Sequence, residues 1–279
     1  MSVMPEKYDL HCHSNASDGS LSPTEVIQRA TEQGVTVLAL TDHDTTAGLQ
    51  EAQQATIGRQ IRLINGIELS ASYLHQCLHI IGLNIDPQHA VLMQGLATQQ
   101  RVRAERAKKI ADKLEKKGIP GVYAAVLQMA GEAEITRSHF ADFLVANGYA
   151  DTQQGAFDRY LSQGKPAYVP TLWAELADAV SWITQAGGIA VLAHPMRYKL
   201  SCKWLNRALP QFKEMGGVGI EVVNGRGSVE ELRQSYDLAK KHQLYASVGS
   251  DFHNPDNQWL ELGRLADLPK DLPAVWELF

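Results

Sequence analysis

The chain has 279 residues, a length that suits one large domain or a domain carrying an insertion. Its hydrophobic content of 44% and charged content of 20% are ordinary for a globular protein, and its net charge of −5 argues against broad nucleic-acid binding through a basic surface. Three scattered cysteines exclude a disulfide framework, and no apolar run is long enough to span a bilayer. Because residues 1–6 show no charged-then-apolar pattern, we expect a cytoplasmic protein.

The first part of the chain alternates short apolar runs with helical patterns. A strand is expected at 8–11, and Ser22, Pro23 and Glu25 then form a capping box that opens a helix ending at Gly34. The next run, 35–40, is continuously apolar, which is typical of a strand buried on both faces. The elements expected after it are a helix at 45–56, a strand at 61–67 that ends at Glu68, and a strand at 78–83.

The pattern changes between residues 86 and 168, where strand signals are few and Ala, Gln, Lys, Arg and Glu are frequent. A charged helix is expected at 99–117, stopped by Gly118 and Pro120. Further helices are expected at 122–131, 137–147 and 151–161. We therefore predict a helical insertion at 86–168, within a domain formed by residues 1–85 and 169–279.

After Thr171 the alternation of strands and helices returns. Strands are expected at 189–193, 218–223 and 244–249, and they end at His194, Asn224 and Ser250. Strands that alternate with helices predict an α/β fold with a parallel sheet or barrel.

Polar side chains gather where the predicted strands end. In barrels of parallel strands the active site lies at that face. Imidazole and carboxylate ligands without thiolate suit Zn, Mn or Fe(II) in a catalytic site. The residues concerned are His11, His13, Asp42, His43, Glu68, His194, Asn224, Asp251 and His253.

Each residue also has a structural interpretation. The pair His11 and His13 alone could be incidental, and Cys12 between them is expected to pack in the core. Asp42 could cap the helix at 45–56, and for Asp44 capping is the favoured interpretation. His79 lies on an apolar strand, where a core histidine is the default. The conjunction of polar strand ends, rather than any one residue, favours a metal site.

The motifs, in chain order, are His11-x-His13, Thr41-Asp42-His43, Gly66-Ile67-Glu68, His79, His194-Pro195 and Gly249-Ser250-Asp251-x-His253. They resemble the motifs of the PHP (polymerase and histidinol phosphatase) family and span about residues 10–255. The resemblance implies a distorted (β/α)₇ barrel with a helical insertion. More closely, the chain resembles short bacterial members that act on nucleoside 3′,5′-bisphosphates, with related members that degrade short RNA from the 5′ end.

The resemblance also implies two or three divalent metal ions. We expect Mn, with Zn, Fe and Mg as alternatives. Many members have a histidine where this chain has Asp18, and a carboxylate favours Mn or Mg more than imidazole does; the structural alternative for Asp18 is a turn residue. The implied ligands are His11, His13, Glu68 and Asp251 for the first ion, Glu68, His79 and His194 for the second, and Asp18, His43 and His253 for the third.

The implied reaction is hydrolysis of the 3′-phosphate of a nucleoside 3′,5′-bisphosphate by metal-hydroxide attack. Its catalytic residues would be Asp42, His43, Glu68 and Asp251, with Asp42 orienting a ligand histidine or a water. The candidates for holding the second phosphate are Arg137, Ser138, His139, Lys165 and Arg197. Arg137 could instead be a charge on a helix surface, and Thr136 could cap that helix.

Four other functions stay open. The same site could act on short 5′-phosphorylated RNA as a 5′–3′ exoribonuclease, or as a histidinol-phosphate-type phosphatase. Carbon–nitrogen bond hydrolysis is disfavoured because no modified lysine is evident at a strand end, and a non-enzymatic metal-binding module is disfavoured by the nearly complete ligand set. The expected partner is a nucleotide or short RNA, with no duplex DNA, membrane or obligate protein partner.

Overall fold

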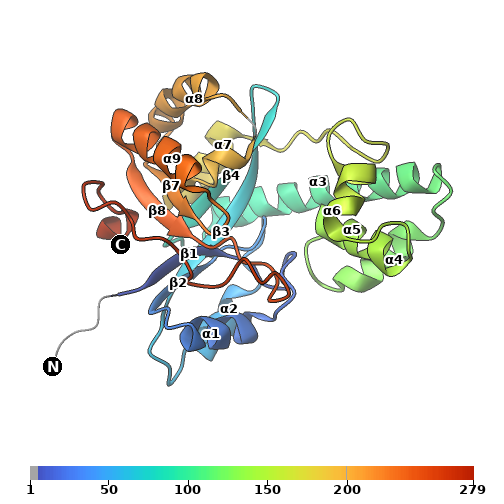
Figure 1. Cartoon of the computed structure of the whole chain (residues 1–279), viewed down its shortest axis with the longest axis horizontal. Coiled ribbons are helices and arrows are strands. Elements are labelled where there is room, and N and C mark those ends of the chain that lie inside the picture. The colour runs from blue at the N-terminus through green and yellow to red at the C-terminus, as the bar shows by residue number, and fades with distance from the viewer. Residues whose placement is uncertain (1–5, 199) are drawn as a thin grey trace.

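The computed structural model describes residues 6–198 and 200–279, so the first five residues of the predicted segment 1–85 lie outside the described part. A strand-rich lobe is joined to a smaller lobe made of helices (Figure 1). The strands are β1 (Tyr8–Cys12), β2 (Val37–Leu40), β3 (Arg62–Tyr73), β4 (Gln76–Leu83), β5 (Ala174–Glu175), β6 (Ile189–Leu192), β7 (Gly219–Asn224) and β8 (Tyr245–Gly249).

Helices cover the outside of the sheet and build the second lobe (Figure 1). Among the described residues, no helix combines the length and the apolar character needed to cross a membrane. The α-helices are α1 (Pro23–Glu32), α2 (Leu49–Ala55), α3 (Ala90–Glu115), α4 (Val122–Ala130), α5 (Arg137–Ala146), α6 (Gln153–Ala156), α7 (Leu176–Gln185), α8 (Cys202–Glu214) and α9 (Val229–His242). Shorter turns are the π-helix η1 (Phe157–Leu161) and the 3₁₀-helices η2 (Pro195–Tyr198) and η3 (Val275–Leu278).

The sheet curls until its first and last strands meet. The strand order is β1-β2-β3-β4-β6-β7-β8, with β5 paired to β3 at the side. Just after β8, the Asp251 amide donates to the His11 carbonyl of β1 at 2.7 Å, and the His13 amide donates to the Phe252 carbonyl at 2.9 Å. These bonds nearly close a barrel, which confirms the predicted α/β barrel class, and they bring the two ends of the sequence together.

The predicted strand that ends at Glu68 is wrong in its extent. β3 continues to Tyr73 and forms an antiparallel hairpin with β4, in which Glu68 pairs with Ile81. Leu74 and His75, with φ of 46° and 62°, make the tight turn between the two strands. The sheet is therefore mixed rather than parallel throughout.

The helix expected at 45–56 is shorter, because α2 begins at Leu49 and has no side-chain cap. The capping interpretation of Asp44 is therefore wrong. Its carboxylate accepts hydrogen bonds from the Ser70 amide at 2.8 Å and from Arg103 Nε at 2.7 Å. Asp44 thus joins the end of β2 to both β3 and α3, whereas the predicted capping box at Ser22 is confirmed.

The long helix α3 belongs to both lobes. It begins at Ala90, earlier than the predicted 99, and Leu92 and Leu96 pack into the barrel core. Gly95 allows a close approach to α7, since a Cβ there would lie 2.4 Å from the Trp182 ring. The second half of α3 packs in a separate core with α4 and α5. The insertion is thus anchored by a continuous helix, and its boundary at residue 86 stays a prediction.

The buried ion pair of Asp44 and Arg103, with side chains 0% and 5% exposed, predicts a large effect on stability. Arg103→Met would leave the Asp44 carboxylate buried without its counter-charge and lower the free energy of unfolding by about 3 kcal/mol. Urea unfolding followed by circular dichroism measures this. Lys109→Met is the matched control on the same helix, because its pair with Glu105 is exposed, and a loss of similar size there would contradict the account.

Candidate metal centre

His11 and His13 are fully buried at the end of β1. Their Nε2 atoms lie 3.1 Å apart, which aims two imidazole lone pairs at one point. Cys12 between them faces the opposite side and is buried in the core, as predicted. Asp251 completes this group, since its Oδ1 lies 3.5 Å from His11 Nε2 and 3.4 Å from His13 Nε2.

Glu68 stands at the centre of the site, in β3, with its side chain completely buried. Its two carboxylate oxygens face different histidines, so it could bridge two ions. Oε1 lies 3.4 Å from His11 Nε2, 3.0 Å from His79 Nδ1 and 3.1 Å from His194 Nε2, and Oε2 lies 3.3 Å from His13 Nε2 and 3.0 Å from His43 Nδ1.

The third predicted group also comes together. Asp18 Oδ1 lies 3.4 Å from His253 Nε2, 3.9 Å from His43 Nε2 and 4.0 Å from His13 Nδ1. The second group is arranged differently: Glu68 forms one compact cluster with His43 and His79, and another with His11 and His194. That His79 and His194 share one ion therefore stays a prediction.

The donor atoms fit divalent cations. Several of them are buried and have no hydrogen-bond partner among the described residues, namely His13 Nδ1, His43 Nδ1, His194 Nδ1 and Glu68 Oε2. His43 Nδ1 and Glu68 Oε2 lie 3.0 Å apart without forming a hydrogen bond. Buried polar atoms without partners are costly, and a cation that accepts their lone pairs removes the cost.

The electrostatics of the centre depend on Glu68. Burial opposes its charge, but the imidazoles of His11, His43 and His79 outweigh burial and hold the pKa of Glu68 well below its usual range. Burial also lowers the pKa of His11 and His79, yet Glu68 and other neighbours raise both values to about 10. Ligand imidazoles must be deprotonated, so metal affinity rises with pH.

Glu221, which sequence reasoning missed, contacts two predicted ligands. Its Oε1 lies 3.0 Å from His11 Nδ1, and its Oε2 accepts a hydrogen bond from the His194 amide at 2.7 Å. A carboxylate on Nδ1 fixes the tautomer of His11 and leaves Nε2 free for a metal ion. The available signal was a single glutamate inside the apolar strand β7, which is buried except at its last residue, Asn224.

Asp42 holds the turn that carries Asp18. Among the described residues, its hydrogen bonds come from the Ser14 amide, the Ser14 hydroxyl and the Ser17 hydroxyl, each at 2.7 Å. None of these bonds comes from a ligand histidine, and the role of Asp42 in orienting a histidine or a water stays a prediction. Only glycine fits at position 19 in the same turn, because a Cβ there would lie 2.5 Å from the His13 carbonyl oxygen.

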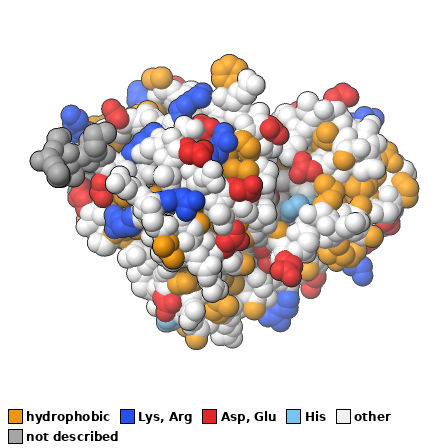
Figure 2. All heavy atoms as spheres, turned by 90° about the horizontal axis from the view of Figure 1, so that it is seen from below, with side chains coloured by type: hydrophobic (Ala, Val, Ile, Leu, Met, Phe, Trp, Pro, Cys, Tyr) orange, Lys and Arg blue, Asp and Glu red, His pale blue; other side chains and the backbone are white. Residues whose placement is uncertain are grey.

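Helix α5 of the insertion reaches the metal centre. The Ser138 hydroxyl donates to Asp18 Oδ2 at 3.0 Å, which links the insertion to a predicted ligand. Thr136 caps the helix, as predicted, and His139 Nδ1 accepts from the Thr136 amide at 3.1 Å. Nδ1 of His139 is therefore part of the capping box at the N-terminus of α5. Figure 2 shows the surface hollowed between the two lobes, with a histidine visible in the hollow.

A group of arginines lies between α3 and α5. Arg137 packs over the Phe157 ring at 5.6 Å, and Arg103 and Arg106 pack over Trp173 at 5.0 and 5.3 Å. Sequence reasoning missed Arg106, whose Nε is buried without a partner among the described residues. Burial, Arg137 and Arg103 lower the pKa of Arg106 to about 9. Crowded cations of this kind attract anions.

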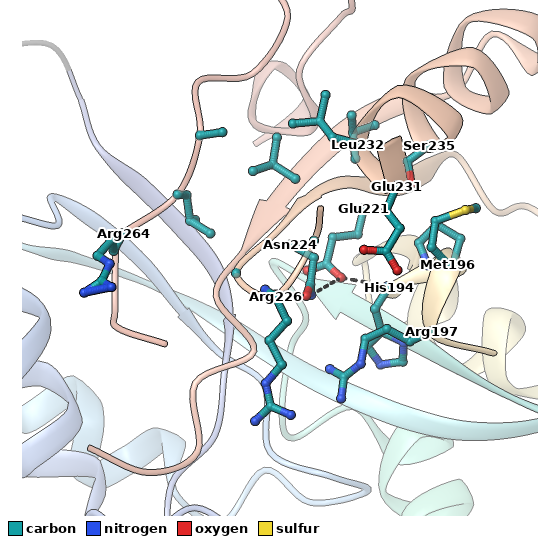
Figure 3. Close-up of a pocket in the computed structure, with 17 residues that line it drawn as sticks. His194, Met196, Arg197, Glu221, Asn224, Arg226, Glu231, Leu232, Ser235 and Arg264 are labelled. Atoms are coloured by element: carbon teal, nitrogen blue, oxygen red, sulfur yellow. Dashed lines mark hydrogen bonds between the residues drawn. The ribbon is translucent and has the colours of Figure 1, made fainter. Parts of the chain in front are cut away.

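The two remaining residues predicted to hold the second phosphate, Lys165 and Arg197, lie in different parts of the structure. Lys165 is exposed, and none of the described polar contacts joins its side chain to the metal centre. Arg197, in η2, pairs through Nη1 with Asp251 Oδ2. Arg197 is thus at the metal centre itself, on the side that Figure 3 shows beside His194.

The barrel carries overlapping clusters of His, Asp and Glu side chains, and a group of arginines lies on the insertion. Together they are typical of a metal-dependent phosphoester hydrolase. Residues 9–188 match the model of the PHP domain. The chain belongs to the PHP family, as the motifs predicted.

Close relatives have two different names. The chain is 46% identical over 276 residues to a 5′-3′ exoribonuclease of Haemophilus influenzae, covering 99% of this chain and 100% of that protein. It is 44% identical over 269 residues to a 3′,5′-nucleoside bisphosphate phosphatase of Chromobacterium violaceum, covering 96% and 94%. A solved structure from Chromobacterium violaceum, described as an amidohydrolase with bound sulfate, is 43% identical, with a TM-score of 0.93 over 98% of this chain and 95% of that one.

The contact between Glu221 and His11 predicts an effect on metal binding. Glu221→Gln removes the charge that fixes the His11 tautomer and should weaken Mn²⁺ binding by about 10- to 100-fold, measured by competition with a fluorescent chelator. Glu230→Gln, an exposed change in α9, is the control and should bind as the wild type does. Equal affinity in both variants would remove the proposed role of Glu221.

Proposed function

We propose that this enzyme hydrolyses the 3′-phosphoester bond of a ribonucleotide that carries a 5′-phosphate. The minimal substrate is a nucleoside 3′,5′-bisphosphate, which yields the 5′-monophosphate and inorganic phosphate. The observation that carries the proposal is the arginine group of Arg103, Arg106 and Arg137 beside the ligand cluster of Glu68 and His79. Burial opposes the lowered pKa of the Cys77 thiol, which His79 and then Arg106 and Arg137 favour, so both arginines lie near Cys77, two residues from His79.

Two anion-binding places are what a bisphosphate requires. One phosphate must be held at the metal centre and cleaved, and the other must be held without cleavage. Arg106 and Arg137 supply guanidinium groups, which bind phosphate oxygens in pairs. A bound phosphate would also relieve the repulsion between these two cations. The hydrogen bond of Ser138 with Asp18 fixes α5 against the metal centre, so the distance between the two places is set by the fold.

Divalent ions, for which we propose Mn, would neutralise charge on the phosphoryl oxygens and lower the pKa of water at this site. Glu68, Asp251 and Asp18 hold the carboxylate oxygens that such ions require. In the overall reaction the water oxygen bonds to phosphorus, the bond between phosphorus and O3′ breaks, and O3′ gains a proton. Arg197 lies against Asp251, where it can contact the departing phosphate.

A second candidate is 5′–3′ degradation of short 5′-phosphorylated RNA. It is favoured by the 46% identity to a protein named as a 5′-3′ exoribonuclease. The same bond to O3′ is cleaved in both reactions, and the same 5′-phosphate is held. The two candidates differ only in what is attached to the far side of the scissile phosphate.

The test is phosphate release from adenosine 3′,5′-bisphosphate, 3′-AMP, 5′-AMP and histidinol phosphate with Mn²⁺. The bisphosphate should be the best substrate, and Arg137→Ala should reduce its preference over 3′-AMP by about tenfold, because a guanidinium contact to the second phosphate is lost. Arg101→Ala, an exposed change on α3, is the control. Faster turnover of histidinol phosphate, or an unchanged preference in Arg137→Ala, would contradict the proposal.

A further inference from the structure

A cavity of about 240 Å³ opens beside the metal centre, on the side of Arg197 rather than on the side of the insertion. It begins at His194 and lies between η2, the turn after β7, the start of α9 and residues 264–266. Its walls include Met196, Leu232 and Leu265, which are apolar. His194 is the one predicted ligand that lines it, and the arginines of the insertion are not among its lining residues.

Two arginines stand at its mouth. Figure 3 shows the side chains of Arg197 and Arg226 extending to the same side of the cavity, whereas Arg264 lies apart. Partial shielding from water and the charge of Arg197 lower the pKa of Arg226, so the two groups are near neighbours. Within residues 6–198 and 200–279 no ion pair engages Arg226, whereas Arg197 pairs with Asp251. Arg226 is therefore free to bind an anion that leaves the metal centre.

An exposed aromatic ring lies on the segment that follows β8. Trp259 is 87% exposed, which is unusual for the largest apolar side chain. Its neighbour Leu260 is buried against the turn that carries Arg226, since a Cβ on Gly225 would lie 2.5 Å from Leu260 Cδ1. The residue next to Trp259 thus packs on the turn that carries Arg226, which links the exposed ring to the mouth of the cavity.

We propose that Arg226 and Trp259 form a binding track for the part of a single-stranded RNA that lies beyond the scissile phosphate. Guanidinium groups followed by an exposed aromatic ring suit the phosphate backbone and the stacked bases of a single strand. This inference rests on the proposed function, because it assumes cleavage at O3′ with the 5′-phosphate held by the insertion. A nucleoside bisphosphate ends at the scissile phosphate and has nothing to place on the track.

The kinetic test compares two substrates with the same enzyme. One is adenosine 3′,5′-bisphosphate and the other is a 5′-phosphorylated pentaribonucleotide, both with Mn²⁺. Arg226→Ala and Trp259→Ala should each lower the ratio of kcat/KM for the RNA to kcat/KM for the bisphosphate by about tenfold. Arg207→Ala, which removes an exposed arginine from α8, is the matched control and should keep the wild-type ratio.

A binding test separates the track from the chemistry. In EDTA, where no hydrolysis occurs, binding of the pentaribonucleotide is followed by anisotropy at several salt concentrations. Loss of one phosphate contact in Arg226→Ala should reduce the slope of log K against log salt by about 0.7. Trp259→Ala should weaken binding with the slope retained, because stacking releases no counterion.

The outcomes distinguish this proposal from the proposed function. If the wild type cleaves the bisphosphate and the variants keep its substrate ratio and its salt slope, the track is wrong and the function stands. If the wild type cleaves neither substrate, the proposed function fails, and the binding test in EDTA decides the track alone. A tenfold loss of the ratio in Arg207→Ala as well would show an effect of net charge and overturn the track.

Discussion

The structure depends on one buried carboxylate and the imidazoles around it. Glu68 is completely buried and has five histidine side chains within 3.4 Å of its oxygens. Burying charge at this density is costly unless each group has a partner of opposite sign. In this site the balance is incomplete, because several donor atoms point inward without a hydrogen bond. Divalent ions complete the balance, and the hydrolytic function follows from the same constraint.

Two of the residues placed around Glu68 have unfavourable backbone conformations. His194 and Asp251 have φ of 26° and 56°, and such left-handed conformations are unfavourable for residues other than glycine. The bond between the Asp251 amide and the His11 carbonyl holds one of them where β8 meets β1. The antiparallel hairpin of β3 and β4 brings Glu68 and His79 together from opposite chain directions, with Glu68 Oε1 3.0 Å from His79 Nδ1. Closure of the sheet and this hairpin together assemble ligands that are far apart in sequence.

The structure brings the predicted ligands together, and their binding of metal stays a prediction. Most of them follow or begin an apolar run, so they could be read from predicted strand ends, whereas Asp18 and the grouping of the ligands came from the resemblance to the PHP family. The sequence did not predict the hairpin, since an apolar strand looks the same whether it runs parallel or antiparallel. Asp44 was misassigned because an aspartate before a helical pattern is typical of a cap, and only tertiary structure brings Arg103 to it. Arg106 was missed because nothing local distinguishes a charge that faces a site from one that faces water, whereas Glu221 carried a local signal, a single glutamate inside an apolar strand, that was not used.

The most direct test of the account is the metal content and activity of Glu68→Gln, a change that keeps the shape of the side chain and removes its charge. The account predicts a folded protein in which bound Mn per chain and hydrolysis of adenosine 3′,5′-bisphosphate both fall to about a hundredth of the wild-type values or less at limiting metal. Metal content is measured by mass spectrometry after dialysis, with circular dichroism to establish folding. A folded variant that keeps the wild-type metal content and activity would contradict the central role of Glu68.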